Sequence, residues 1–527
     1  MGLGMDRKMG HRLFAAVLAA FFLFLVSACG GGGGSTSSGS SVGTASISVT
    51  DAPGNFDHVY ITLTSVWVHA SADADATNTA GWQKFPLSSP VTIDLTQLEN
   101  GQLEKVWSAF SLPAGSYQQI RFFVAPTEDA LTASAQALGL KYNNEVVDQT
   151  GAFYPLRIVA PASGIKLIGT FTMAAGGTLD LGVDFDALHD VVQITAFGAG
   201  TTEYMLKPRL TYFDLDSAGA VTGSITNGAA LDANDHFVIK AEQLNSDGTY
   251  HVVRRWTGVD KNGDFTLYPL APGTYDVVIR GLDTETMIIR NVPVIKGTTP
   301  TSSPTNIGAV TTVAGTDYNA SGQVKPTGAW VQFYQTPSAS DVPYEIRYRH
   351  FDPLAGQFAD FALSNSPMWV GSYNGNAPVS FSQATPVEGT GVYKAYATAE
   401  LYDRSAAVIV NGTDAASLDF GTLAITAPAV AHQVSGTFSM AGNAGPFNSG
   451  YVIATYGGTI VNAVSPAPIQ NNSSYVIGDL PGGVPKAFYG IEAWAWNSNS
   501  FAIGRPRVAN LTNGDDTVNI QMKTFTP

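Results

Sequence analysis

Short runs of alternating apolar and polar residues constrain the fold of this chain more than any other feature. Residues 45–50 (Ala-Ser-Ile-Ser-Val-Thr) alternate in this way, and residues 179–186 alternate strictly. A period of two puts the apolar side chains on one face, as in a half-buried strand. Turn residues such as Asp-Ala-Pro-Gly at 51–54 end the runs. The pattern predicts an all-β chain of antiparallel β-sandwiches in tandem.

Length and composition limit the partners. A chain of 527 residues has room for roughly three to five domains. Its net charge of −15 disfavours nucleic acid as a partner, because phosphates require a basic surface. A single cysteine excludes a disulfide framework and Cys-ligated zinc. After residue 28 no apolar run approaches the length of a membrane-spanning helix.

The first 28 residues have the pattern of an export signal. Three basic residues (Arg7, Lys8 and Arg12) precede an apolar run over 13–26. Val26-Ser27-Ala28-Cys29 resembles the lipobox of bacterial lipoproteins. The resemblance implies cleavage between Ala28 and Cys29, with diacylglycerol on the cysteine sulfur and palmitate among the added acyl chains. The alternative is an ordinary cleaved signal with a buried or free thiol at Cys29.

Residues 29–43 combine the predicted lipid carrier with a Gly/Ser/Thr tether. The composition predicts a flexible segment that spans roughly 20 Å. Gly30 stands where lipoproteins held at the inner membrane tend to have Asp, so the resemblance implies the outer membrane. A G-x-S-x-G match at 39–43 lies inside this tether and lacks the strand–turn–helix context of a hydrolase nucleophile.

The next segment carries several motifs in a fixed order. They are Ser-Val-Thr-Asp-Ala-Pro-Gly at 48–54, Leu-Pro-Ala-Gly-Ser-Tyr at 112–117, Val-Asp-Phe-Asp at 183–186 and Leu-Lys-Pro at 206–208. Together they resemble the N-terminal domain of bacterial lipoproteins that is known only as a domain of unknown function. The resemblance covers residues 44–214 and implies no catalytic residues.

One strand of this segment has an acidic face. Asp180, Asp184 and Asp186 project opposite the apolar side chains of the same run. Clustered carboxylates suit Ca²⁺, which takes six to eight oxygen ligands. The alternative is the solvated face of an amphipathic strand. No other cofactor is expected.

Three further segments predict sandwich modules at 218–298, 309–427 and 431–527. Residues 263–279 of the first resemble the carboxypeptidase regulatory-like, or prealbumin-like, sandwich, with Leu-Ala-Pro-Gly-Thr-Tyr as the turn. The last module repeats the turn loosely at Leu480-Pro481-Gly482. The middle module lacks the turn, so its fold stays open. Linkers are expected near 298–305 and 427–431.

The last module also contains a pair of tryptophans. Trp494 and Trp496 are two residues apart and therefore share one face of a strand, with alanines on the other. In the middle module the matching strand has alanines on its expected inner face. By analogy Trp494 and Trp496 are expected to be exposed beside Glu492, where flat rings could stack on sugars. The alternative places both rings in a core or a domain interface.

These features predict a non-enzymatic, lipid-anchored protein of the bacterial outer membrane, which faces the periplasm or the outside. Its sandwiches would serve binding, adhesion or structure, with the membrane and a polysaccharide or envelope protein as partners. The alternative is a carbohydrate-binding lipoprotein. A hydrolase would need an acid, a base and a nucleophile in one pocket, and the sequence contains no such motif.

Overall fold

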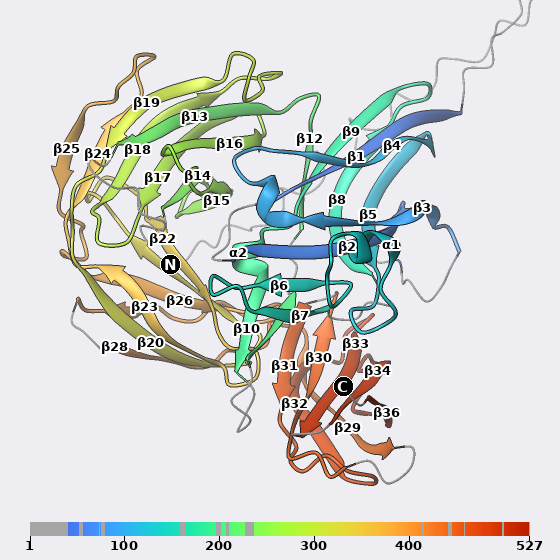
Figure 1. Ribbon diagram of the computed structural model, residues 1–527. Coiled ribbons are helices and arrows are strands. Elements are labelled where there is room, and N and C mark those ends of the chain that lie inside the picture. Colours follow the sequence, from blue (N-terminus) through green and yellow to red (C-terminus); the bar gives the residue numbers. More distant parts are fainter. Residues whose placement is uncertain are drawn as a thin grey trace, which may run out of the picture. The chain divides into compact units, whose positions relative to one another are not determined.

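The computed structural model describes residues 41–51, 56–72, 74, 80–158, 164–195, 202–206, 210–226, 237–412, 416–440, 445–457, 459–497 and 500–525. Residues 41–527 form one compact unit. Strands dominate this unit, which confirms the predicted all-β class (Figure 1). Among the described helices, none has the length and hydropathy needed to cross a membrane. Ala28 and Cys29 lie outside the described residues.

The first domain is a sandwich of two sheets. One sheet has the order β12-β9-β1-β4, and the other has the order β10-β11-β7-β6-β2-β5-β8 with β3 on β2. The elements are β1 (Val42–Thr50), β2 (His58–His69), β3 (Gln83–Asp94), η1 (Leu95–Leu98), β4 (Glu104–Pro113), β5 (Gly115–Val124), α1 (Ala133–Ala137), β6 (Glu145–Val147), β7 (Phe153–Ile158), β8 (Ile165–Met173), β9 (Thr178–Asp184), α2 (Ala187–Asp190), β10 (Val191–Thr195), β11 (Thr202–Leu206) and β12 (Thr211–Asp214).

The second module has one sheet in the order β16-β13-β19 and another that begins β15-β14-β17-β18. Its strands are β13 (Gly219–Thr226), β14 (Val238–Leu244), β15 (His251–Thr257), β16 (Asp264–Leu270), β17 (Gly273–Arg280), β18 (Thr286–Val294) and β19 (Thr305–Thr311). Because β19 pairs with β13, the second module continues past the linker expected at 298–305.

The third module has the sheets β23-β20-β28 and β22-β21-β26-β27. Its strands are β20 (Asp317–Lys325), β21 (Trp330–Gln335), β22 (Tyr344–His350), β23 (Gln357–Ser364), β26 (Tyr393–Thr398), β27 (Val408–Val410) and β28 (Ala416–Thr422). Two further strands, β24 (Met368–Ser372) and β25 (Phe381–Ala384), leave this module and extend the sheet of the second, where β24 pairs with β18. The two modules therefore share a sheet.

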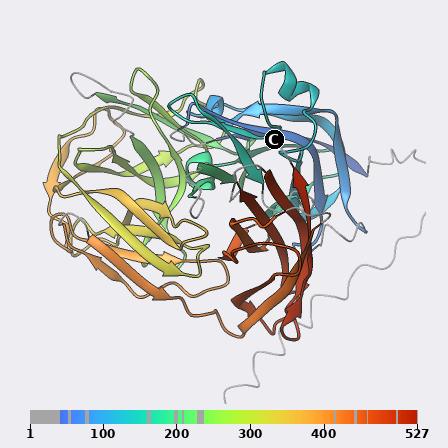
Figure 2. The same cartoon turned by 60° about the horizontal axis from the view of Figure 1, so that its bottom comes forward.

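The fourth module comes forward in Figure 2, coloured orange to red. Its strands have the order β31-β30-β33-β34-β36-β29-β32, with β35 on β29. They are β29 (Val430–Met440), β30 (Ser449–Tyr456), β31 (Thr459–Val464), β32 (Ser474–Gly482), β33 (Phe488–Asn497), β34 (Ser500–Asn510), β35 (Asp516–Thr517) and β36 (Ile520–Phe525).

A common strand arrangement underlies all four units. In each, the first strand pairs antiparallel with the fourth and parallel with a late strand, as in β1 with β4 and β9 or β20 with β23 and β28. The second strand pairs with the third and the fifth, as in β14 with β15 and β17 or β30 with β31 and β33. The middle module therefore has the same topology as its neighbours, and the first domain is an enlarged version of it.

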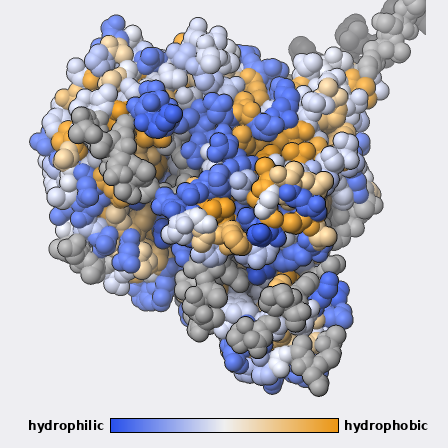
Figure 3. Space-filling model, in the orientation of Figure 1, coloured by the Kyte–Doolittle hydropathy of each residue, from blue (hydrophilic) through white to orange (hydrophobic). Residues whose placement is uncertain are grey.

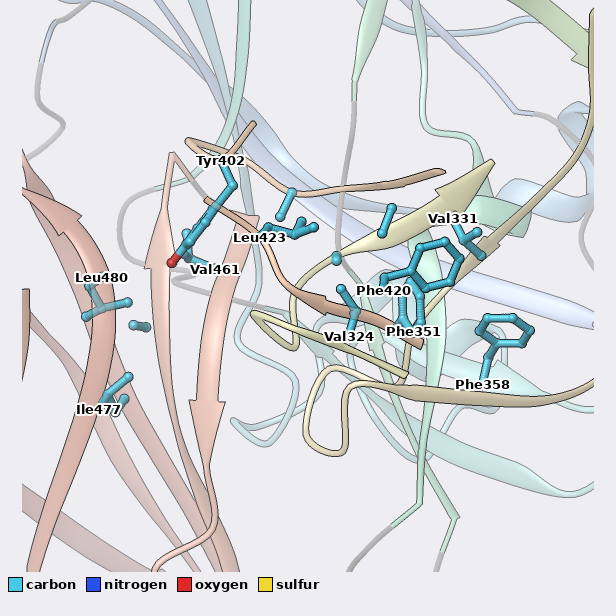
Figure 4. Packing of buried hydrophobic residues seen from close by; sticks show 14 of the residues in the cluster. Val324, Val331, Phe351, Phe358, Tyr402, Phe420, Leu423, Val461, Ile477 and Leu480 are labelled. Atoms are coloured by element: carbon cyan, nitrogen blue, oxygen red, sulfur yellow. The ribbon is translucent and has the colours of Figure 1, made fainter. Parts of the chain in front are cut away.

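The cores follow the period-two pattern. Leu181, Val183 and Phe185 are buried in the first domain, as their alternation predicted. On β26, Ala395 and Ala397 are buried, whereas Lys394 and Tyr396 are only partly covered. The cores of the third and fourth modules merge into one cluster. Figure 4 shows Tyr402 and Leu423 of the third module near Val461 and Leu480 of the fourth.

A buried tyrosine links the fourth and fifth strands of every unit. Its hydroxyl donates a hydrogen bond to a carbonyl at or next to the end of the fourth strand. The pairs are Tyr117 to Pro113 at 2.8 Å, Tyr275 to Ala271 at 2.8 Å, Tyr393 to Ser364 at 3.1 Å and Tyr489 to Pro481 at 2.7 Å. In the first three units the two strands belong to different sheets, so this bond fixes how the chain crosses between them, as a tyrosine corner does in other sandwiches. Burial raises the pKa of Tyr393 to about 12, so its hydroxyl stays a donor at neutral pH.

Tyr275→Phe and Tyr489→Phe should each lower the free energy of unfolding by about 1 kcal/mol, because each removes a hydroxyl hydrogen bond, partly buried for Tyr275 and buried for Tyr489. Urea unfolding of residues 41–527 would measure the change. Tyr373→Phe is the control, since no described hydrogen bond involves its hydroxyl. Equal midpoints for all three variants would contradict a stabilising role for this bond.

Candidate functional site

The tryptophan pair is buried, which confirms the alternative of a core or a domain interface, and the expected exposure is wrong. Trp494 is 5% exposed and Trp496 is 9% exposed, and Glu492 beside them is 2% exposed. Their rings pack on Tyr451, with centroid separations of 5.2 Å and 5.6 Å, in a cluster that includes Met205 and Leu354. The alanine face of β33 lies in the core of the fourth module, as expected. Residues from other modules cover the opposite face, which removes the basis for a glycan site there.

The three aspartates of the predicted calcium site each have a different donor. Lys105 Nζ lies 3.0 Å from Asp180 Oδ2, Arg255 pairs with Asp184, and Trp256 Nε1 donates to Asp186 Oδ2 at 3.0 Å. Within the described ranges, no group of three or more His, Cys, Asp or Glu side chains is placed to hold a metal. Asp184 is only 6% exposed, so a fully solvated face is wrong as well.

Two signature motifs of the first domain meet at this point. The Ala187 amide donates to Asp51 Oδ1 at 2.6 Å, which brings Asp51, the fourth residue of the Ser-Val-Thr-Asp-Ala-Pro-Gly motif, against the end of Val-Asp-Phe-Asp. Arg255 of the second module donates to the Asp51 carbonyl and to Thr50 Oγ1, each at 3.2 Å. Burial, and then the charge of Asp184, raise the pKa of Asp51 well above its usual range. The motifs thus build a buried polar junction between two modules.

Sequence reasoning missed a second cluster, here called the basic–aromatic face. It lies on the outer side of the sheet β3-β2-β5-β8, where cross-strand pairing places Lys84, Trp67, Arg121 and Lys166 in one row. Trp82 and Phe123 flank this row. The ring centroid of Trp67 lies 4.3 Å from that of Phe123 and 5.8 Å from that of Trp82.

The cations of this face contact its rings. Lys84 Nζ lies 3.6 Å from the Trp67 centroid, and the guanidinium carbon of Arg121 lies 5.6 Å from the Trp82 centroid. Lys84 is exposed, Trp67 and Phe123 are partly exposed, and Arg121 is buried. A signal for this face was present in the sequence. Val66 and Val68 are apolar and buried, so Trp67 between them had to point outward.

A cavity of about 410 Å³ opens beside Lys84, between the edge strands β3 and β4. Polar and apolar atoms both line its open surface, and the polar atoms have the larger share. Phe85 and Phe110 are in ring contact at 4.3 Å, and Trp107 Nε1 donates to the Phe85 carbonyl at 3.1 Å. Among its described lining residues, only Lys84 carries charge. These described lining residues therefore do not combine the acid and base that hydrolysis requires.

Comparison with known proteins gives one family match. Residues 42–208 match a family described as "Domain of unknown function (DUF4382)", which confirms the resemblance expected for the first domain. Curated proteins contain no match to this chain.

Solved structures give weak likenesses. The TIE protein of Bacillus anthracis is 10% identical over 89% of this chain and 69% of its own, with a TM-score of 0.14. The major pilin SpaD of Corynebacterium diphtheriae is 11% identical over 60% of this chain and 99% of its own, with a TM-score of 0.14. A cohesin–X-dockerin complex from Acetivibrio cellulolyticus is 20% identical over 18% of this chain and 58% of its own chain, with a TM-score of 0.13. At these scores the likenesses carry no argument about function.

Asp51→Asn should stabilise the protein increasingly as pH rises. A raised pKa means that folded Asp51 binds its proton more tightly than unfolded Asp51, so wild-type stability falls as pH climbs from about 4 toward the raised pKa. Asn removes this dependence and keeps an oxygen for the Ala187 amide. Thermal unfolding of both proteins at pH 4 and pH 7 should show a gap only at pH 7. A constant gap would contradict the burial argument.

Proposed function

We propose that this chain is a lipid-anchored, non-catalytic protein of the bacterial cell envelope, and that its four sandwiches act as one stiff structural body that carries binding surfaces. The observation that supports this proposal most is the pairing of buried charges between successive modules. An exported β-rich chain of independent modules would leave such side chains in solvent, where ion pairs contribute little.

The junction between the second and third modules is the best example. Lys240 Nζ lies 3.0 Å from Glu345 Oε1 and donates to the Glu345 carbonyl at the same distance. The two residues are 3% and 5% exposed. Gln332 completes the site by donating to Glu345 Oε2 at 2.6 Å. A buried pair is stable only when both partners stay in place, because either charge alone would lack solvation. Relative movement of the two modules is therefore costly.

A second buried pair lies at the same junction, and a third lies between the first and second modules. Arg280 of the second module is 1% exposed and pairs with Asp317 of the third. Arg255 of the second module is 2% exposed and pairs with Asp184 of the first. These strongly polar groups are engaged in holding modules together, which supports a structural role for them and not a catalytic one.

Lys240→Met should separate the unfolding of the second and third modules, because it leaves Glu345 buried and unpaired. A loss of about 3–5 kcal/mol is expected, and Lys240→Met with Glu345→Leu should recover much of it. Scanning calorimetry of residues 41–527 would report both effects. Lys105→Met is the matched control, since its pair with Asp180 is largely exposed, at 48% and 31% of the side chains, and should contribute no more than about 1 kcal/mol. Equal effects of Lys240→Met and Lys105→Met would overturn the stiff-body proposal.

The anchor has its own test. Cells that express the full chain and grow with labelled palmitate should incorporate label into the wild-type protein and none into Cys29→Ser. Label retained by Cys29→Ser would contradict lipidation at this residue, as would an unlabelled wild-type protein. Fractionation of labelled membranes would then test the outer-membrane assignment that Gly30 implies.

A further inference from the structure

The basic–aromatic face departs from the rest of the chain in its charge. The protein carries a net charge of −15, yet three cations (Lys84, Arg121 and Lys166) occupy one cross-strand row. Arg121 also donates to the Ala74 carbonyl at 3.2 Å, and its burial holds it in the sheet. Lys84 is the exposed member of the row. An exposed cation beside aromatic rings on an acidic protein favours an anionic partner.

The same face exposes apolar side chains. Ile168, which pairs with Gln119 in the neighbouring row, is 53% exposed, and the rings of Trp67 and Phe123 are partly exposed. Figure 3 shows the surface in one orientation, with hydrophobic side chains gathered over the first domain. Tryptophan next to lysine, with an aliphatic side chain beside them, is the composition that binds at the headgroup level of a bilayer.

The tether ends close to this face. A Cβ added to Gly43 would lie only 2.1 Å from Met173 Sδ, so β1 starts beside the end of β8. Met173 pairs with Gly115, and Arg121 lies six positions further along β5. At about 3.3 Å per residue, the basic row is about 20 Å from the entry of the tether. Val42 and Gly43, expected in the tether, belong to β1, and the composition of the remaining residues 30–41 predicts a span of about the same length.

We infer that the basic–aromatic face of the first domain binds the anionic lipid surface next to the anchor. Lys84 would pair with lipid phosphates while Trp67 and Ile168 enter the headgroup region. The inference rests on the proposed lipid anchor for its geometry. An acidic polysaccharide would satisfy Lys84 but would give Ile168 no apolar surroundings, so the bilayer fits the face better.

The test uses residues 41–527, which form one compact unit and lack Cys29. Sedimentation with phosphatidylcholine vesicles that contain phosphatidylglycerol should show binding, and phosphatidylcholine alone should bind at least tenfold less. Loss of one positive charge near an anionic surface weakens affinity about fivefold, so Lys84→Glu should weaken it more than tenfold. Trp67→Ala should weaken it at least threefold. Lys261→Glu, an equal charge change on an exposed hairpin turn of the second module, is the control.

Three outcomes would overturn the inference. They are equal binding to both vesicle types, unchanged binding by Lys84→Glu, and retention on an acidic polysaccharide column without vesicle binding. Because the fragment carries no Cys29, its vesicle binding is independent of palmitate labelling. Vesicle binding without palmitate labelling would contradict the lipid anchor and support the lipid-binding face. Palmitate labelling without vesicle binding would support the anchor and contradict the lipid-binding face.

Discussion

A hydroxyl hydrogen bond between the fourth and fifth strands is the constraint that every unit of this protein shares. In the first three units these strands lie in different sheets, and in all four a buried tyrosine near the start of the fifth strand joins the two strands. Where the turn is short, as at residues 112–117, the tyrosine hydrogen bond and the turn-forming Pro and Gly residues both stabilise the connection. In the third module the turn is replaced by a long excursion that contains β24 and β25, yet Tyr393 still bonds to Ser364. The tyrosine hydrogen bond is therefore kept even where the short turn between the two strands is replaced by a long segment.

Side chains that are buried outside the sandwich cores explain how the modules are joined to one another. Each sandwich uses one face of each sheet for its own core, and the remaining faces either meet solvent or another module. Here several outer faces carry charged side chains that find partners across a junction, such as Lys240 with Glu345. The first domain uses its most recognisable motifs in the same way, since Asp51 and Asp184 both contact Arg255. Motifs of this kind can mark a junction with no chemistry of its own.

The sequence predicted what depends on local periodicity. Alternation identified the β class, the inner faces of β9 and β26, and the alanine face of β33. Alternation alone did not decide between exposure and burial of Trp494 and Trp496, because the residues that cover them, Met205 and Leu354, are far away in the chain. It also missed the basic–aromatic face, since Lys84, Trp67 and Arg121 become neighbours only when β3, β2 and β5 pair. A local two-residue period carries no information about contacts between segments that are far apart in the sequence.

The parallel pairing of first and late strands has a mechanical consequence. Because β13 and β19, or β20 and β28, run side by side in the same direction, the chain enters each sandwich at one end and leaves it at the other. Tension along the chain would pull these neighbours past each other, so their ladder hydrogen bonds would be loaded together in shear and not opened one at a time. A protein built this way resists stretching best along its own chain direction.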